Sequence, residues 1–221
     1  MNLQVRSTGP WQHTLEIEVP ADEVDRRLDE VARQIQRRAS LPGFRRGKVP
    51  LDLVRQHFAD TVEQEFLEAF VPQVTGEAVD QARQSVALEP SYASAHFSLG
   101  EAYRVKGMLT EALAEYGRAE DLGWHGAQVG RALTLAKLGR ATEARRLARG
   151  LEEEFTRRYV APDWIAVIYT ALGDRETAFR WLQRSLETHS LWEIWMAMPD
   201  WDPIRRDPRF DAILRRMGLV Q

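Results

Sequence analysis

One short run of residues, from Gly43 to Pro50, carries the side chains of this 221-residue sequence that are best suited to binding chemistry. It reads GFRRGKVP, so two glycines frame a phenylalanine and two arginines, and a lysine follows. Because glycine accepts backbone conformations that other residues avoid, Gly43 and Gly47 permit tight turns that present the residues between them at a loop tip. An aromatic ring beside guanidinium groups suits a phosphate backbone or an acidic protein surface.

The charge around this loop is strongly polarised. No acidic residue lies between Val31 and Leu51, where six cations give a local charge of +6. Residues 52 to 89 then hold eight acids against two arginines, and the net charge of the whole chain is only −3. A basic binding surface must therefore be local, although these cations could equally solvate a helix face and a turn. The six are Arg33, Arg37, Arg38, Arg45, Arg46 and Lys48.

Residue types suited to catalysis or metal binding are poorly placed. The sequence has no cysteine, which removes thiolate metal sites and cysteine nucleophiles. Its five histidines are scattered without the spacing of metal ligands. No Walker loop, dinucleotide fingerprint or nucleophile elbow occurs. The sequence therefore predicts no catalytic residue, no metal site and no cofactor.

The elements that position the loop follow from the periodicity of apolar residues. Alternation on both sides of a Gly-Pro turn predicts a β-hairpin over residues 2–19. Apolar residues at spacings of three and four predict a helix over 22–39. Further helices are predicted over 51–58 and from about 60 onward. The basic loop should therefore connect two helices.

From about residue 76 the strand signals disappear and a repeat begins. Gly107, Gly139 and Gly173 lie 32 and 34 residues apart, each between two helical patterns. A period near 34 with helix, glycine turn and helix is typical of tetratricopeptide repeats. We predict about three and a half repeats over 76–191 and a helical cap over 192–221. The cap carries Trp192, Trp195 and Trp201.

Residues 1 to about 82 resemble the ribosome-binding domain of bacterial trigger factor. The resemblance is carried by the hairpin, by VPADEVDRRLDEVARQIQRRASLPGFRRGKVP, and by the later helix with QEFLEAFVPQV. It implies that the loop docks on protein and RNA of the large ribosomal subunit beside the exit tunnel. Phe44, Arg45 and Arg46 match the contacting triplet. The residues implied to shape or support it are Gly43, Gly47, Lys48, Pro50, Arg37 and Arg38.

The sequence departs from that family in two ways. The strands that complete the family's small sheet are missing, and so are the prolyl-isomerase domain and the helical substrate-cradling arms. The expected fold class is therefore an α+β N-terminal domain, a β-hairpin plus helices over 1–82, followed by an all-α solenoid. The incomplete hairpin should either pair with a second copy in a homodimer or be shielded by adjoining helices. Without the isomerase domain, the chain is not expected to be an enzyme.

Tetratricopeptide arrays bind peptides or partner proteins on their concave face. The repeat register places a mixed, partly apolar set of side chains on that face. The same residues could instead pack the repeats together, and the two readings are equally supported. The lysine and asparagine cluster that clamps C-terminal carboxylates in some chaperone cofactors is missing. The candidate peptide-binding residues are Phe97, Glu101, Arg104, Val129, Leu133, Val167 and Thr170.

These observations predict a ribosome-associated chaperone or adaptor that acts in the cytoplasm. Its loop would dock near the exit tunnel, and its solenoid would hold nascent or unfolded polypeptide or a partner protein. The alternative is a cytoplasmic scaffold whose N-terminal domain no longer docks on ribosomes. A prolyl isomerase is disfavoured. Neither DNA nor a membrane is expected as a partner, since the chain is not basic overall and has neither a signal peptide nor an apolar span.

Overall fold

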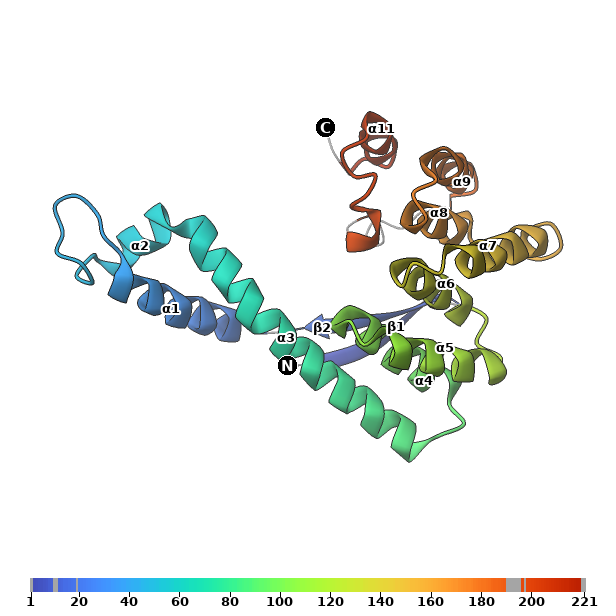
Figure 1. Cartoon of the computed structure of the whole chain (residues 1–221), viewed down its shortest axis with the longest axis horizontal. Coiled ribbons are helices and arrows are strands. Elements are labelled where there is room, and N and C mark those ends of the chain that lie inside the picture. Colours follow the sequence, from blue (N-terminus) through green and yellow to red (C-terminus); the bar gives the residue numbers. More distant parts are fainter. Residues whose placement is uncertain (1, 10–11, 19, 190–195, 197, 220–221) are drawn as a thin grey trace. The chain divides into compact units, whose positions relative to one another are not determined.

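A computed structural model of the chain describes every residue except 1, 10–11, 19, 190–195, 197 and 220–221 (Figure 1). The chain divides into two compact units, residues 1–89 and residues 90–221. No helix of the described part is long and apolar enough to cross a membrane.

Helices form the body of the first unit, namely α1 (Ala21–Arg38), α2 (Leu51–His57) and α3 (Ala59–Leu88). Helix α1 is amphipathic, and its buried face packs on α2 and on the first half of α3. The rings of Phe66 and Phe70 stack in this core with centroids 4.9 Å apart. Its fully or nearly fully buried members are Val31, Ala32, Ile35, Ala39, Val49, Val54, Val62 and Phe66.

Two strands, β1 (Asn2–Gly9) and β2 (Gln12–Glu18), pair antiparallel in a sheet of two strands. The described core of the first unit, in contrast, consists of residues from helices and from the loop between α1 and α2. The predicted β-hairpin is present, but the other elements of the described chain are helices, so the expected α+β class is corrected to a helical fold that carries a two-stranded hairpin. The physical reason is that an isolated two-stranded hairpin is marginally stable and does not make a sheet layer by itself.

Helix α3 runs unbroken for 30 residues, which corresponds to about 45 Å. It continues through Pro72, and the Thr75 hydroxyl donates hydrogen bonds to the carbonyls of Val71 (2.9 Å) and Pro72 (3.1 Å). The repeat pattern in the sequence predicts that the repeats start at residue 76. In the structure that segment is the second half of α3, and the first unit extends to Glu89.

The second unit begins with three successive helix pairs (Figure 1). Each pair turns at a glycine with a left-handed backbone, with φ of +81° at Gly107 and +76° at both Gly139 and Gly173. Only glycine adopts this conformation without strain, which explains its recurrence in the sequence. The pairs are α4 (Ala93–Lys106) with α5 (Leu109–Asp121), α6 (Ala127–Lys137) with α7 (Ala141–Phe155), and α8 (Pro162–Ala171) with α9 (Arg175–Glu187).

A short 3-10 turn, η1 (Pro199–Trp201), and helix α11 (Pro208–Arg216) follow the three pairs. Trp201 and Phe210 are completely buried in the same core as the residues of α8 and α9. This part of the chain therefore closes the end of the helical stack. Trp192 and Trp195, which the sequence analysis also assigned to the cap, lie outside the described residues.

Candidate functional site

The basic loop between α1 and α2 is tied down at both ends. Where α1 ends, the Gly47 amide donates a hydrogen bond to the Ala39 carbonyl at 3.1 Å. On the other side, the Gln36 side-chain amide donates to the Val49 carbonyl at 2.7 Å, and the Val49 side chain is completely buried in the core. Pro50 then precedes the first residue of α2. These contacts hold the loop in place before any partner arrives.

The two glycines of the loop are required by its backbone. Both have positive φ, +87° at Gly43 and +75° at Gly47. A Cβ atom on Gly47 would lie 3.1 Å from the Arg37 carbonyl oxygen, whereas one on Gly43 would meet nothing within 4 Å. Gly47 is therefore fixed by both conformation and contact, and Gly43 by conformation alone.

Phe44, Arg45, Arg46 and Lys48 of this loop face the solvent. Phe44 keeps 41% of its surface exposed, which is unusual for a large aromatic side chain. Arg45, Arg46 and Lys48 are exposed beside it. Backbone hydrogen bonds from Phe44 to Leu41 (3.1 Å) and from Lys48 to Arg45 (2.9 Å) order the tip. The loop thus presents one ring and three cations on an ordered frame.

The cations of this region fall into two groups. Arg33 pairs with Asp29 on the same helix at 4.0 Å, and Arg38 pairs with Glu65 of α3. Among the described residues, by contrast, the four cations Arg37, Arg45, Arg46 and Lys48 have no ion-pair partner. Their charge is not cancelled locally, so it is available to attract an anionic surface. Arg38, predicted as part of the same site, already has a carboxylate partner.

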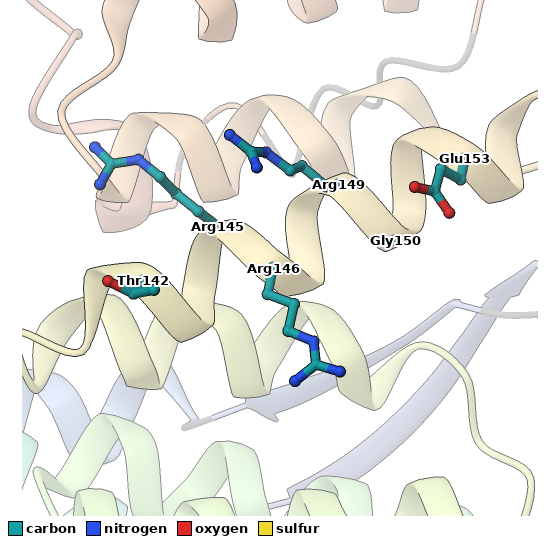
Figure 2. A pocket seen from close by; sticks show the side chains of 6 residues that line it. All are labelled: Thr142, Arg145, Arg146, Arg149, Gly150 and Glu153. Carbon is teal, nitrogen blue, oxygen red and sulfur yellow. The ribbon is translucent and has the colours of Figure 1, made fainter.

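In the second unit, a hollow of about 500 Å³ lies on the exposed side of α7 (Figure 2). No sequence motif marks this hollow, because its residues belong to an ordinary amphipathic helix. Its lining is entirely polar or glycine. The lining residues are Thr142, Arg145, Arg146, Arg149, Gly150 and Glu153.

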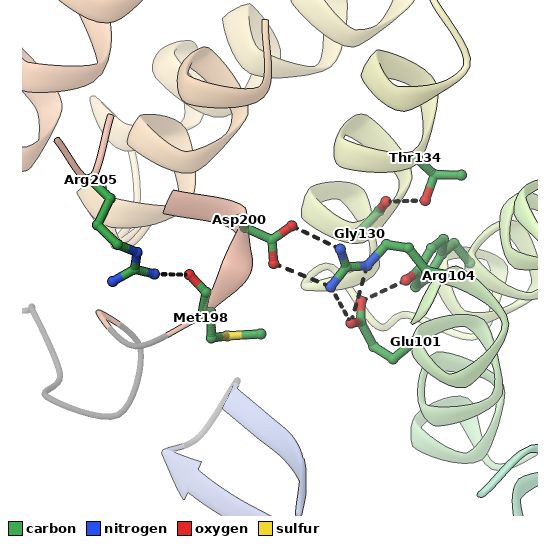
Figure 3. A network of polar contacts seen from close by, with 8 residues as sticks. Glu101, Arg104, Gly130, Thr134, Met198, Asp200 and Arg205 are labelled. Carbon is green, nitrogen blue, oxygen red and sulfur yellow. Dashed lines mark hydrogen bonds and ion pairs between the residues drawn. The ribbon is translucent and has the colours of Figure 1, made fainter. Parts of the chain in front are cut away.

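Elsewhere in the same unit, four polar side chains form a hydrogen-bonded network, which we call the inner face (Figure 3). Its members are Glu101, Arg104, Tyr116 and Asp200. Arg104 of α4 donates to Glu101 and to Asp200 of η1, both at 2.9 Å. The Tyr116 hydroxyl donates to the other oxygen of Glu101 at 2.6 Å. Gly130 of α6 makes room for this arrangement, because a Cβ atom there would lie 2.6 Å from the Tyr116 ring.

Arg104 is paired with both carboxylates of this network. Burial by itself would lower the pKa of Arg104, but the carboxylates of Glu101 and Asp200 hold that pKa well above its ordinary value. Burial raises the pKa of the Tyr116 hydroxyl, and the nearby Glu101 carboxylate raises it further. Arg104 therefore stays charged and is ion-paired to two carboxylates. The four cations of the basic loop have no such partner among the described residues.

The other residues predicted to line a peptide groove are mostly inaccessible. Val129 and Leu133 are each only 6% exposed, and Val167 is completely buried. Thr170 is 1% exposed, and its hydroxyl donates to the Ala166 carbonyl at 3.0 Å. These four side chains pack the helices together, which is the second reading that the sequence left open. As peptide contacts they are excluded by their burial in this structure.

At the inner face, the predicted groove residue Phe97 contacts this network, and Asp200 joins it from a distant part of the chain. The half-buried ring of Phe97 lies 6.1 Å from that of Tyr116 and 5.9 Å from that of Trp124. Asp200 was missed because it lies 96 residues from its partner Arg104, and no local pattern marks it. Within the described part of the chain, no group of three or more side chains could hold a metal ion.

The described fold is that of a helical protein with a basic, solvent-exposed loop on its first unit and three helix pairs in its second unit. Residues 1–110 match the family model described as bacterial trigger factor protein (TF). The predicted resemblance of the N-terminal region is thereby confirmed, and the match extends through α3 and α4. The assignment of the second unit to tetratricopeptide repeats stays a prediction.

Individual trigger factors match part of the chain. The chain is 36% identical over 95 residues to the trigger factor of Solibacter usitatus (strain Ellin6076), covering 43% of this chain and 22% of that protein. It is 34% identical over 101 residues to the trigger factor of Azotobacter vinelandii, covering 46% of this chain and 23% of that protein. The chain thus spans less than a quarter of the length of these relatives. No solved structure matches it.

Proposed function

We propose that this protein is a ribosome-associated chaperone or adaptor that docks on the large ribosomal subunit, near the exit tunnel, through its basic loop. The observation that carries the proposal is the ordered loop tip, where exposed Phe44 stands among cations without ion-pair partners in the described chain. Such a surface suits ribosomal RNA phosphates and acidic patches of ribosomal proteins. The similarity of residues 1–110 to trigger factor supports the same role.

Each residue of the loop has a distinct part in the proposal. Phe44, Arg45 and Arg46 make the contacts, while Gly43 and Gly47 give the loop its shape. Arg37 and Lys48 add charge around the contact, and Pro50 leads into α2. The loop is pre-ordered by its hydrogen bonds, so little conformational entropy is lost on docking.

The second unit is proposed to be a tetratricopeptide-type solenoid that holds nascent or unfolded polypeptide or a partner protein. Its contacts would lie outside Val129, Leu133, Val167 and Thr170, since these are buried. Exposed apolar side chains elsewhere on the unit are better placed to touch an unfolded chain. They include Val105, Leu122, Leu138 and Tyr159.

Docking is tested by sedimentation of the purified chain with large ribosomal subunits in low salt. The triple variant F44A/R45A/R46A should lose most of the binding, and wild-type binding should fall steeply as salt rises. The matched control is R157A/R158A/Y159A, which removes the same charge and one exposed aromatic ring from the second unit. Equal pelleting of wild type and the loop variant would overturn docking and leave the cytoplasmic scaffold as the better account.

The proposal also holds that the chain binds unfolded polypeptide without isomerising prolyl bonds. A protease-coupled assay with a proline peptide should therefore show no acceleration by the purified chain. Aggregation of a chemically denatured model protein should be slowed in the same buffer. Clear isomerase turnover would contradict this part of the proposal without affecting ribosome docking.

A further inference from the structure

The exposed arginines of α7 form a second basic surface, which we call the α7 arginine face and define as Arg145, Arg146 and Arg149. Arg145 and Arg149 point to one side of the helix, one turn apart, and Arg146 points to the other (Figure 2). All three line the same hollow of about 500 Å³. None of them has a hydrogen-bond or ion-pair partner within the described part of the chain.

The charge order along α7 works against the stability of the helix. Cations are favoured near a helix C-terminus and anions near its N-terminus, because of the helix dipole. In α7 the first turn follows this preference with Glu143, but the three arginines lie in the middle and the last turn contains Glu152 to Glu154 and no basic residue. Arg145 and Arg149 are also like charges at the unfavourable i, i+4 spacing.

Gly150 adds a further cost at the same place. It lies inside the helix, where glycine is less favourable than alanine, and it lacks the positive φ that would require glycine. A Cβ atom on Gly150 would meet nothing within 4 Å, so internal packing does not require glycine either. Helix α7 therefore contains two unfavourable features close together, the mid-helix arginines and Gly150. Both would favour binding of an anionic ligand that lies close to the helix backbone between the arginines.

From this geometry we propose that the α7 arginine face binds the phosphate backbone of double-helical RNA. Guanidinium groups make paired hydrogen bonds to phosphate oxygens, and successive cations along a helix can follow a row of phosphates. The missing side chain at Gly150 lets a backbone approach the helix.

The lining of the hollow favours this ligand over others. None of its six residues is apolar or aromatic, so it offers no pocket for the side chains of a peptide. It also offers no ring on which the bases of a single strand could stack. Double-helical RNA, in contrast, is recognised through its shape and its phosphates, which requires neither.

This inference rests on the proposed function, because ribosomal RNA is the double-helical RNA that a docked chain would meet. Its test nevertheless uses no ribosome. Binding of a fluorescent RNA duplex of about 16 base pairs, the length that a small double-strand-binding domain covers, is followed by anisotropy. The starting protein is the full chain carrying F44A/R45A/R46A, so that the basic loop makes no contribution.

In that background, R145Q/R146Q/R149Q should weaken duplex binding at least tenfold. It should also lower the slope of log affinity against log salt by about 2 to 3, roughly one for each lost phosphate contact. The matched control is R175Q/R180Q/R184Q on α9, which removes the same charge and should leave both quantities almost unchanged. Thermal unfolding of each variant checks that the fold is retained.

Two outcomes would overturn the inference. Equal duplex affinity of the α7 and α9 variants would show that the α7 arginine face makes no specific contribution. Displacement of the duplex by poly-glutamate at matched charge concentration would assign the face to an acidic protein instead. Loss of ribosome sedimentation in the loop variant alone bears on docking, so the two proposals fail separately.

Discussion

The basic loop of the first unit and the inner face of the second unit both place arginine beside an aromatic ring, but their surroundings differ. At the loop, Arg45 and Arg46 stand exposed beside Phe44 with no ion-pair partner in the described chain. On the inner face, Arg104 lies near Tyr116 and is held by two carboxylates, with only 12% of its side chain exposed. The loop arginines can therefore pair with an anionic partner, whereas Arg104 is already paired within the fold.

The difference teaches that residue type does not distinguish a binding cation from a structural one. The deciding quantity is whether the fold brings an acid to the guanidinium group. For Arg104 the second acid, Asp200, comes from a distant part of the chain. For the loop cations, the acid-free stretch between Val31 and Leu51 keeps local partners away.

The largest effect should come from breaking the inner-face pair. Replacing Arg104 by methionine leaves two largely buried carboxylates without a cation, which should cost about 3 to 5 kcal/mol of unfolding free energy. Replacing Arg45 by methionine should change stability by less than about 0.5 kcal/mol, since the side chain is exposed. Urea unfolding followed by tryptophan fluorescence measures the first, because six of the seven tryptophans belong to the second unit.

The triple variant E101Q/R104M/D200N provides the control for this experiment. It removes the two charges that the single variant leaves unpaired, so it should recover much of the lost stability. If R104M and R45M lowered the unfolding free energy equally little, the distinction between ion-paired and unpaired arginines would be wrong.

A second prediction concerns a buried acid that has no cation. Asp163 of α8 is 1% exposed; the Ser185 hydroxyl donates to one of its oxygens at 3.4 Å, and the other has no hydrogen-bond partner in the described chain. Burial raises the pKa of Asp163 to about 7, far above its ordinary value of 3.8. The fold therefore favours the protonated form of Asp163.

The sign of the pH dependence follows from this raised pKa. Between about pH 4 and pH 7 the folded state keeps the proton that the unfolded state has lost, so stability falls as pH rises. The slope from this one group is at most about 1.4 kcal/mol per pH unit, and it vanishes above pH 7. Comparing urea unfolding of wild type and D163N across pH 4 to 8 isolates it. A constant difference between the two proteins over that range would contradict the prediction.

A third prediction separates the two glycines of the basic loop. Gly47→Ala combines positive φ with a Cβ atom 3.1 Å from the Arg37 carbonyl oxygen, and should cost about 2 kcal/mol. Gly43→Ala has the backbone strain alone and should cost about 1 kcal/mol. Because the fluorescence of the second unit is insensitive to this change, hydrogen exchange of amides in α1 and α2 is the measurement. Equal costs would show that contact with Arg37 does not matter.

The smallest effect should come from adding one open cation to the loop region. Glu65→Gln removes the partner of Arg38, an exposed pair whose loss should cost less than about 1 kcal/mol. The freed guanidinium should then strengthen binding to ribosomal subunits and steepen its salt dependence slightly. Replacing Glu68, an exposed acid one turn further along α3, by glutamine serves as the control. Unchanged binding would show that Arg38 does not face the partner.

Local pattern predicted much of this fold. The apolar spacing of α1, the break at Pro42-Gly43 and the recurring Gly107, Gly139 and Gly173 each act over a few residues, and the elements lie where these signals indicated. The exposed loop tip was likewise foreseeable, because its glycines and its lack of acids are local properties.

The misjudged features depend on contacts between distant residues. The predicted groove residues Val129, Leu133 and Val167 have the right helical spacing, but neighbouring helices and the closing segment bury them. The fold class was misjudged because alternation in the sequence shows that a strand forms, but not how many strands pair, and the sheet has only two. The sequence does not single out the α7 arginine face, because it does not show which arginines find an acidic partner. Only the structure shows that these three have none among the described residues.

The contact between Arg104 and Asp200 has a consequence for how the second unit unfolds. In an open array of helix pairs, each pair touches only its neighbours, so the ends fray independently and unfolding spreads step by step. Here α4, at one end of the array, is bonded to η1, which follows the last pair in the chain. Loss of the closing segment therefore removes a contact from the first pair as well as from the last. The unit should melt as a single cooperative body, more like a closed ring than a stack.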